Sequence, residues 1–190
     1  MNLASYNGGQ NTGFTKSVTS VTAGDIVTLA EAKAFCRITD SDEDTIVTLL
    51  IAMAEEQVEN FAGITLRATT YTFEYETFGN RIRLPYQPIK TVTEVRTKVD
   101  GVETILDSDS YQLIGQDEKT LKIIAPIYGG IEIDCTAGYG VADVPSTIKL
   151  AILKTVLTNY ENRQDNSGEQ SFMLPDSAKS LLKSYKRVMI

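Results

Sequence analysis

Residues 28–61 constrain the fold most strongly, because they contain the signals for two consecutive helices. Thr28 followed three residues later by Glu31 has the capping-box spacing, in which each side chain accepts a hydrogen bond from the other residue's backbone amide. The sequence therefore predicts a short helix that starts directly after Thr28. Ile38 and Thr39 are expected to end it, because β-branched side chains lose conformational freedom in a helix.

The second helix of this stretch is long and follows an acidic corner, residues 40–44. Asp40 or Ser41 is expected to cap it, because side-chain oxygens at a helix N-terminus accept hydrogen bonds from free amides, and carboxylates there suit the helix dipole. Apolar residues then recur at helical spacing, and Gly63 can end the helix. We expect this face to pack against a C-terminal helix. The predicted helix-pair core consists of Ile46, Leu49, Leu50, Met53, Phe61, Ile152 and Val156.

The hydrophobic pattern changes to period two after these helices, which indicates β-strands. Residues 70–76 alternate between aromatic and polar side chains. A Phe-Gly-Asn turn separates them from a second alternating segment, residues 81–84, so a hairpin is expected here. The dipeptide Asp100-Gly101 predicts another tight turn. Short strands at this spacing predict an antiparallel β-domain, either a small sandwich or an open barrel.

Helical periodicity returns near the C-terminus. Pro145 suits the first position of a helix, where its missing amide has no partner to lose, and Pro175 opens a final helix. The predicted fold class is therefore α+β: a helical bundle built from residues 27–64 and 144–190, with an antiparallel β-domain, residues 65–143, inserted between them. Residues 1–26 are rich in Asn, Gly, Ser and Thr, so we expect a flexible N-terminal arm that a neighbouring subunit can hold.

Charge and residue usage exclude several classes of function. The chain has 25 acidic and 18 basic residues, a net charge of −7, which argues against a dedicated nucleic-acid binder but not against a surface past which DNA slides. No histidine is present, which excludes histidine bases, metal ligands and pH switches. The sequence has no apolar run of about 20 residues and no signal-peptide pattern, so we expect no membrane segment. Cys36 and Cys135 are predicted to be buried thiols rather than a disulfide.

No catalytic, cofactor or metal motif emerges from the sequence. The acidic corner lacks the glycine of a calcium loop, and helix capping explains its carboxylates. The glycine-rich spots match neither a P-loop nor a dinucleotide fingerprint, and neither cysteine has a histidine partner. We therefore expect no enzymatic activity and no cofactor. A small enzyme with carboxylate chemistry is the remaining catalytic alternative.

Several short motifs occur in an order that is typical of one family. Their positions are Val27-Thr28-Leu29-Ala30-Glu31-Ala32-Lys33, the acidic corner, Leu84-Pro85-Tyr86-Gln87-Pro88, Ala137-Gly138-Tyr139 and Tyr160-Glu161-Asn162-Arg163. In their order and spacing the sequence resembles the phage head–tail connector proteins, also called adaptor or head-completion proteins of long-tailed phages. The resemblance covers about residues 26–190, so most of the N-terminal arm lies outside it.

The resemblance implies a structural virion protein of the head–tail junction, made in the host cytoplasm. Such proteins form a ring, usually of twelve copies, whose wall is the helical bundle. The ring lies beneath the portal protein, extends the DNA channel and docks the tail-completion or stopper protein. C-terminal segments of the family commonly engage the portal. Carried to the basic final helix, this makes the portal-interface candidates Lys179, Leu182, Lys183, Tyr185, Lys186 and Arg187.

Two interpretations of the remaining features stay open. The basic final helix is either a solvated face, as the helix dipole favours, or a docking surface for an acidic partner or a phosphate backbone. Tyr71, Tyr75 and Tyr86 either form the buried face of strands or, if exposed, bind ligands. In the second case the protein would be a monomeric binding module whose β-domain recognises sugar or peptide.

Overall fold

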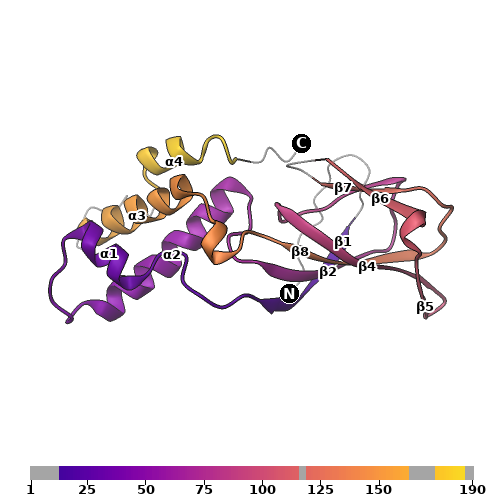
Figure 1. Cartoon of the computed structure of the whole chain (residues 1–190), viewed down its shortest axis with the longest axis horizontal. Coiled ribbons are helices and arrows are strands. Elements are labelled where there is room, and N and C mark those ends of the chain that lie inside the picture. The colour runs from indigo at the N-terminus through magenta and orange to yellow at the C-terminus, as the bar shows by residue number, and fades with distance from the viewer. Residues whose placement is uncertain (1–12, 116–118, 163–173, 187–190) are drawn as a thin grey trace. The chain divides into compact units, whose positions relative to one another are not determined.

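The computed structural model describes residues 13–115, 119–162 and 174–186. The chain divides into two compact units. Among the described residues, 23–66 and those from 140 onward form the helical unit, and those up to 22 together with those between 67 and 139 form the β unit. Helices and antiparallel sheets are both present, so the fold is mixed α+β (Figure 1).

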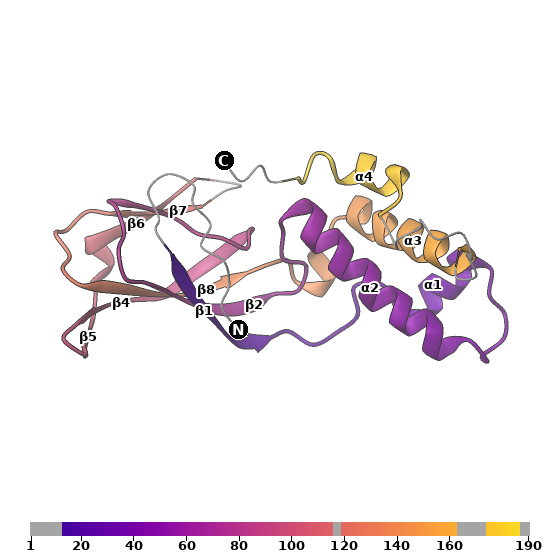
Figure 2. The same ribbon diagram turned by 180° about the vertical axis from the view of Figure 1, so that it is seen from behind.

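The described part of the helical unit contains four helices: α1 (Leu29–Cys36), α2 (Asp44–Ala62), α3 (Ser146–Glu161) and α4 (Asp176–Leu182). Helix α3 contacts the other three, and α2 lies along it (Figures 1 and 2). The capping box of α1 is confirmed: Thr28 Oγ1 accepts from Glu31 N at 3.2 Å, and Glu31 Oε2 accepts from Thr28 N at 2.8 Å. Helix α1 ends at Cys36, before the predicted stop, because Arg37 adopts a left-handed conformation with φ 60°.

Helix α2 begins later than predicted. Glu43 is its N-cap, because a turn in which Asp44 N donates to Ser41 O takes up the preceding residues. The prediction that Asp40 or Ser41 caps α2 is therefore wrong. Asp44 instead forms an ion pair with Lys33 of α1 at 2.5 Å, which joins the two helices at the corner. The predicted end is confirmed, since Gly63 caps the helix with φ 65°.

The buried face of α2 differs from the predicted one. Ile46 and Leu49 are 44% and 68% exposed, so placing them in the helix-pair core is wrong. Apolar residues cover so much of the circumference of α2 that two faces fit the helical spacing. The face that is buried is shifted by one residue from the predicted face, a rotation of roughly 100° about the helix axis. The residues buried on α2 are Val47, Leu50, Ile51, Ala54, Glu55, Val58 and Ala62. Of the other predicted core residues, Ile152 and Val156 are fully buried, whereas Met53 and Phe61 are half-buried.

The described part of the β unit contains two antiparallel sheets. The five-stranded sheet has the order β1 (Phe14–Val21), β2 (Thr69–Tyr75), β8 (Gly130–Ala137), β4 (Ile89–Val99) and β5 (Val102–Ile105). The three-stranded sheet has the order β3 (Arg81–Arg83), β7 (Thr120–Ile123) and β6 (Tyr111–Ile114). Short 3₁₀ turns lie at Ser108–Ser110 in this unit and at Val141–Asp143 in the helical unit.

The predicted N-terminal arm contains a strand. Residues 14–21 form β1, which pairs with β2 along its length, from Phe14 opposite Tyr75 to Val21 opposite Thr69. All eight residues of β1 are exposed, so their composition resembles that of a loop. The Phe14 ring lies edge-on to Phe73, with 5.7 Å between the ring centroids. Backbone pairing and this aromatic contact hold the segment, and the prediction of a flexible arm is wrong for these residues.

The predicted hairpin between residues 70–76 and 81–84 is also wrong. Strands β2 and β3 belong to different sheets, because β1 and β8 occupy both edges of β2 while β3 pairs with β7. The second predicted turn is confirmed. Asp100 and Gly101, with φ of 49° and 80°, join β4 to β5.

The core of the β unit lies beneath the aromatic face of β2. Tyr71, Phe73 and Tyr75 are 7%, 0% and 1% exposed, which confirms the interpretation of this stripe as a buried strand face. Tyr86, which is half-buried, stacks on Tyr71 with 5.0 Å between the ring centroids. The other fully buried residues of this cluster with large side chains are Ile82, Leu84, Ile89, Leu121, Ile131 and Ile133.

Both cysteines are free thiols, as predicted, but only Cys135 is also buried as expected. Cys135 is fully buried on β8, and desolvation, followed by the neighbouring charge of Asp134, raises the pKa of its thiol to about 12. Cys36 is half-buried, and burial raises its pKa as well. Neither thiol is therefore prone to ionise near neutral pH.

Gly129 and Gly101 form a matched pair for testing backbone strain in the β unit. Their φ angles are 79° and 80°, but a Cβ at Gly129 would lie 2.3 Å from Lys98 O, whereas a Cβ at Gly101 would meet nothing within 4 Å. We expect Gly101→Ala to lower the free energy of unfolding by about 1–2 kcal/mol, the cost of a left-handed alanine. Gly129→Ala should lower it by at least roughly 1 kcal/mol more, because β8 must also move away from β4. Equal losses of unfolding free energy for the two variants in chemical denaturation would show that Gly129 does not lie close to the backbone of β4.

Candidate functional site

The basic C-terminal helix, where the portal-interface candidates were predicted, borders a groove on the helical unit. Pro175 precedes α4, and its carbonyl accepts hydrogen bonds from the amides of Ala178 and Lys179, which starts the helix. Buried Ala178 and Leu182 fix α4 to the unit. The opposite side of the helix is left facing outward.

The groove lies between α4 and the C-terminal end of α2 and has a volume of about 350 Å³. We call it the α4 groove. Its lining residues are Phe61, Asp176, Lys179, Ser180, Lys183 and Lys186. Three ammonium groups face one carboxylate, so the groove is basic although the whole chain carries a net charge of −7.

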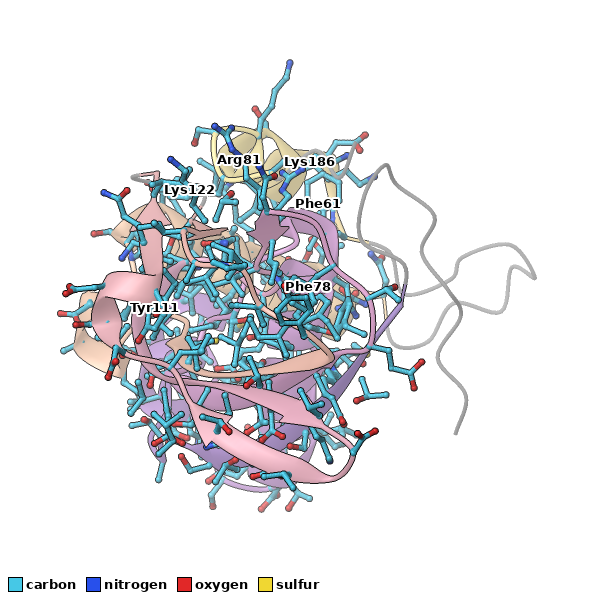
Figure 3. All side chains as sticks on the ribbon, turned by 90° about the vertical axis from the view of Figure 1, so that its right-hand side faces the viewer. Phe61, Phe78, Arg81, Tyr111, Lys122 and Lys186 are labelled. Atoms are coloured by element: carbon cyan, nitrogen blue, oxygen red, sulfur yellow. The ribbon has the colours of Figure 1, made fainter. Side chains whose placement is uncertain are left out.

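Two contacts order the charged side chains of the groove. Lys186 Nζ lies 4.7 Å from the centroid of the Phe61 ring, a cation–π distance (Figure 3). Lys179 Nζ forms an ion pair with Asp176 Oδ1 at 3.0 Å, but Asp176 is 96% exposed, so this pair is screened by solvent. The arrangement therefore offers an aromatic surface with cations at its rim, which suits a partner that carries both carboxylates and apolar groups.

The structure places three of the portal-interface candidates in the α4 groove and buries a fourth. Lys179, Lys183 and Lys186 line the α4 groove. Leu182 is fully buried within the helical unit, so its selection as an interface residue is wrong. A helix as short as α4 is stable only when apolar side chains such as Leu182 pack against the rest of the unit. Tyr185 is half-buried, and Arg187 lies outside the described residues.

Sequence reasoning missed three lining residues. Phe61 was assigned to the helix-pair core, and Asp176 and Ser180 were not selected at all. The sequence did contain a signal for Phe61. The residue lies in the last turn of α2, two positions before the cap at Gly63, and side chains at the end of a helix have fewer neighbours to cover them. No comparable signal marks Ser180.

A second surface on the helical unit is apolar. Ile46 and Leu49 lie one turn apart on α2 and are both exposed. Phe35 on α1 and Leu150 on α3 are 36% and 37% exposed. We call Ile46 and Leu49 the α2 apolar strip. Two apolar side chains exposed on one turn of a helix are a candidate surface for a protein contact.

The described residues offer no evident centre for metal or membrane chemistry. Within residues 13–115, 119–162 and 174–186, no group of three or more acidic or cysteine side chains is placed to hold a metal ion. Likewise, none of the helices in this part of the chain combines the length and apolar character that crossing a bilayer requires.

Comparisons with solved structures identify the fold. The chain is similar to a protein from the neck of an empty gene transfer agent particle computed with C6 symmetry, with a TM-score of 0.74, 21% identity, and coverage of 93% of this chain and 97% of that one. It is also similar to proteins from the virion of a native gene transfer agent particle (TM-score 0.71, 21% identity, 92% and 96% covered) and from a native neck computed with C12 symmetry (TM-score 0.65, 21% identity, 92% and 97% covered). A search of curated protein sequences finds no match.

The sequence was also compared with models of protein families. The model of the Head completion protein family matches residues 25–188, which include all four helices and every strand except β1. This range agrees with the one over which the order of motifs resembles head–tail connector proteins. The chain therefore belongs to the Head completion protein family.

Proposed function

We propose that the protein is a structural component of a phage-like virion and forms a ring at the head–tail junction. The ring would lie beneath the portal, continue the DNA channel and receive the tail-completion or stopper protein. The match of the Head completion protein model to residues 25–188 is the observation that carries this proposal. The similar structures come from particle necks computed with C6 and C12 symmetry, which supports a ring of twelve copies.

The α2 apolar strip supports the side-to-side contact that a ring requires. A ring closes through a heterologous interface, in which one surface of each copy meets a different surface of the next. Ile46 and Leu49 leave apolar area that a single chain does not bury. We assign the α2 apolar strip to this interface. We assign the helical unit, a bundle into which the β unit is inserted, to the wall of the ring.

The α4 groove is assigned to the portal. Its lysines form a surface with a charge opposite to that of the whole chain, and the half-buried Tyr185 lies between Lys183 and Lys186 in the sequence. A portal segment with carboxylates and an apolar side chain would match this surface. In this proposal the protein is made in the host cytoplasm, acts in the virion and needs no cofactor or catalytic residue.

The alternative of a monomeric sugar- or peptide-binding module finds less support. It requires exposed aromatic rings on the β-domain, but Tyr71 and Tyr75 are buried in the core. Tyr86 stacks on Tyr71, and Lys16 Nζ lies 4.2 Å from its ring centroid, so its face is engaged within the β unit.

The first experiment is a measurement of mass in solution by light scattering, for the protein alone and mixed with its cognate portal. A multi-copy ring, or a portal complex that holds many copies, is the expected result. Some assembly proteins oligomerise only on their partner, so a monomer alone would not contradict the proposal. A monomer that also ignores the portal would contradict it.

Leu49→Asp tests the α2 apolar strip. Covering one leucine contributes roughly 1.5–3 kcal/mol, so its loss should weaken each subunit contact about ten- to a hundredfold. We expect the ring to dissociate at concentrations where the wild type stays assembled, with an unchanged melting temperature of the monomer because Leu49 is exposed. Thr48→Asp, on the same turn but roughly 100° away, is the matched control. Equal dissociation of both variants would argue against the strip as the interface.

Lys183→Glu tests the α4 groove. Reversal of a charge at the rim of an interface should weaken portal binding roughly fivefold to tenfold at low salt, and less at high salt because ions screen the attraction. The mass of the ring should not change. Lys154→Glu on α3, which lies outside the groove, makes the same change of charge as a control. Portal binding that is unaffected by Lys183→Glu but lost with Lys154→Glu would move the portal surface to α3.

A further inference from the structure

The outer face of the three-stranded sheet carries a cluster of hydrogen-bond donors. Ile82 and Leu121 point into the core of the β unit, and Leu113 packs against that core. Since strand residues alternate between faces, their neighbours point away from the core. Across β3, β7 and β6 these outward positions form two rows, Arg81–Lys122–Gln112 and Arg83–Thr120–Ile114. We call these six residues the β3–β7–β6 outer face.

Two cations of this face are in direct register. Arg81 on β3 lies opposite Lys122 on β7 (Figure 3). Like charges placed opposite each other on neighbouring strands are destabilising. Arg81 is exposed and Lys122 half-buried, and among the described residues neither forms an ion pair with a carboxylate. Arg81 and Lys122 therefore form a repulsive pair, and neither side chain is buried in the core of the β unit.

In the five-stranded sheet, by contrast, two cations lie beside carboxylates. Arg96 on β4 forms ion pairs with Glu94, with Glu132 across the ladder and with Asp134 at 2.8 Å. Hydrogen bonds to these carboxylates, the largest from Glu132, raise the pKa of Arg96 further above its usual range. Lys98 lies 3.5 Å from Glu74 and 4.0 Å from Glu103. Acidic residues outnumber basic ones in the chain, yet none occupies any position of the β3–β7–β6 outer face.

We propose that the β3–β7–β6 outer face binds the phosphate backbone of double-stranded DNA. Five of its six residues donate hydrogen bonds, and Arg, Lys, Gln and Thr are the side chains that commonly contact phosphate oxygens. A phosphate near Arg81 and Lys122 would remove their mutual repulsion. The inference rests on the proposed function, because a DNA channel at the head–tail junction would bring DNA to this chain. The overall negative charge would keep such contacts weak, so that DNA is guided rather than held.

An acidic protein segment is a less suitable occupant than DNA. Protein interfaces have an apolar centre with charges at the rim. The β3–β7–β6 outer face has the reverse composition: three of its six residues are cations, two are neutral donors, and the apolar Ile114 lies at one end of a row. Phosphate recognition requires no apolar centre, and a strand face presents its cations in regular rows.

Fluorescence anisotropy with a labelled DNA duplex tests the proposal on the full chain. The logarithm of the affinity should fall with the logarithm of salt concentration at a slope of about −1.8, as expected if Arg81 and Lys122 neutralise two phosphates. The double variant Arg81→Gln/Lys122→Gln should reduce the slope to near zero. The control Lys16→Gln/Lys98→Gln removes the same charge from exposed lysines of the five-stranded sheet and should leave the slope unchanged. Thermal melting of each variant checks its folding.

Each other outcome overturns the proposal. The proposal fails if the wild type shows no DNA binding at low salt, or if both double variants lose the same slope. Binding of polyglutamate in preference to DNA would show that the occupant is an acidic protein. Light scattering on the same samples separates this inference from the proposed function: a chain that assembles but does not bind DNA contradicts the inference alone, and one that binds DNA but never assembles with itself or the portal contradicts the connector.

Discussion

Strand β8 is the constraint on which the β unit depends. It pairs with β2 on one edge and β4 on the other, and its inward residues Ile131, Ile133, Cys135 and Ala137 are all fully buried. Because β8 comes late in the chain, its pairing with β2 joins residues about 60 positions apart. This long-range pairing excludes a hairpin between β2 and the strand that follows it. It directs β3 into the second sheet and leaves β1 to cover the remaining edge of β2.

Features whose cause is local could be predicted from the sequence. The capping box at Thr28, the left-handed cap at Gly63 and the turn at Asp100-Gly101 each depend on residues within a few positions of one another. The pairing of β1 could not be predicted in this way, because the polar composition of an exposed edge strand resembles that of a loop. The buried face of α2 could not be predicted either, since its apolar residues fit two faces and only the packing against α3 decides between them.

The candidate site was predictable to a similar extent. The charge pattern of the final helix indicated the three lysines of the α4 groove but not its aromatic floor, Phe61, which comes from a helix about 120 residues earlier. The error at Ile46 and Leu49 is informative for the same reason. A helix that is apolar over more of its surface than its own chain buries has area left for a partner, so the incorrectly predicted core residues become candidates for a subunit contact.

The distribution of charge connects these surfaces. A net charge of −7 disfavours uniform attraction to DNA or to an acidic partner, so any such contact requires cations that the chain itself leaves available. On the five-stranded sheet, Arg96 forms ion pairs with three carboxylates. Near α4, in contrast, Lys186 lies over the Phe61 ring and Lys179 pairs with the exposed Asp176, and on the β3–β7–β6 outer face Arg81 lies opposite Lys122. Under the two proposals, the cations of these surfaces dock the chain at defined positions, while its net negative charge keeps other contacts with DNA weak.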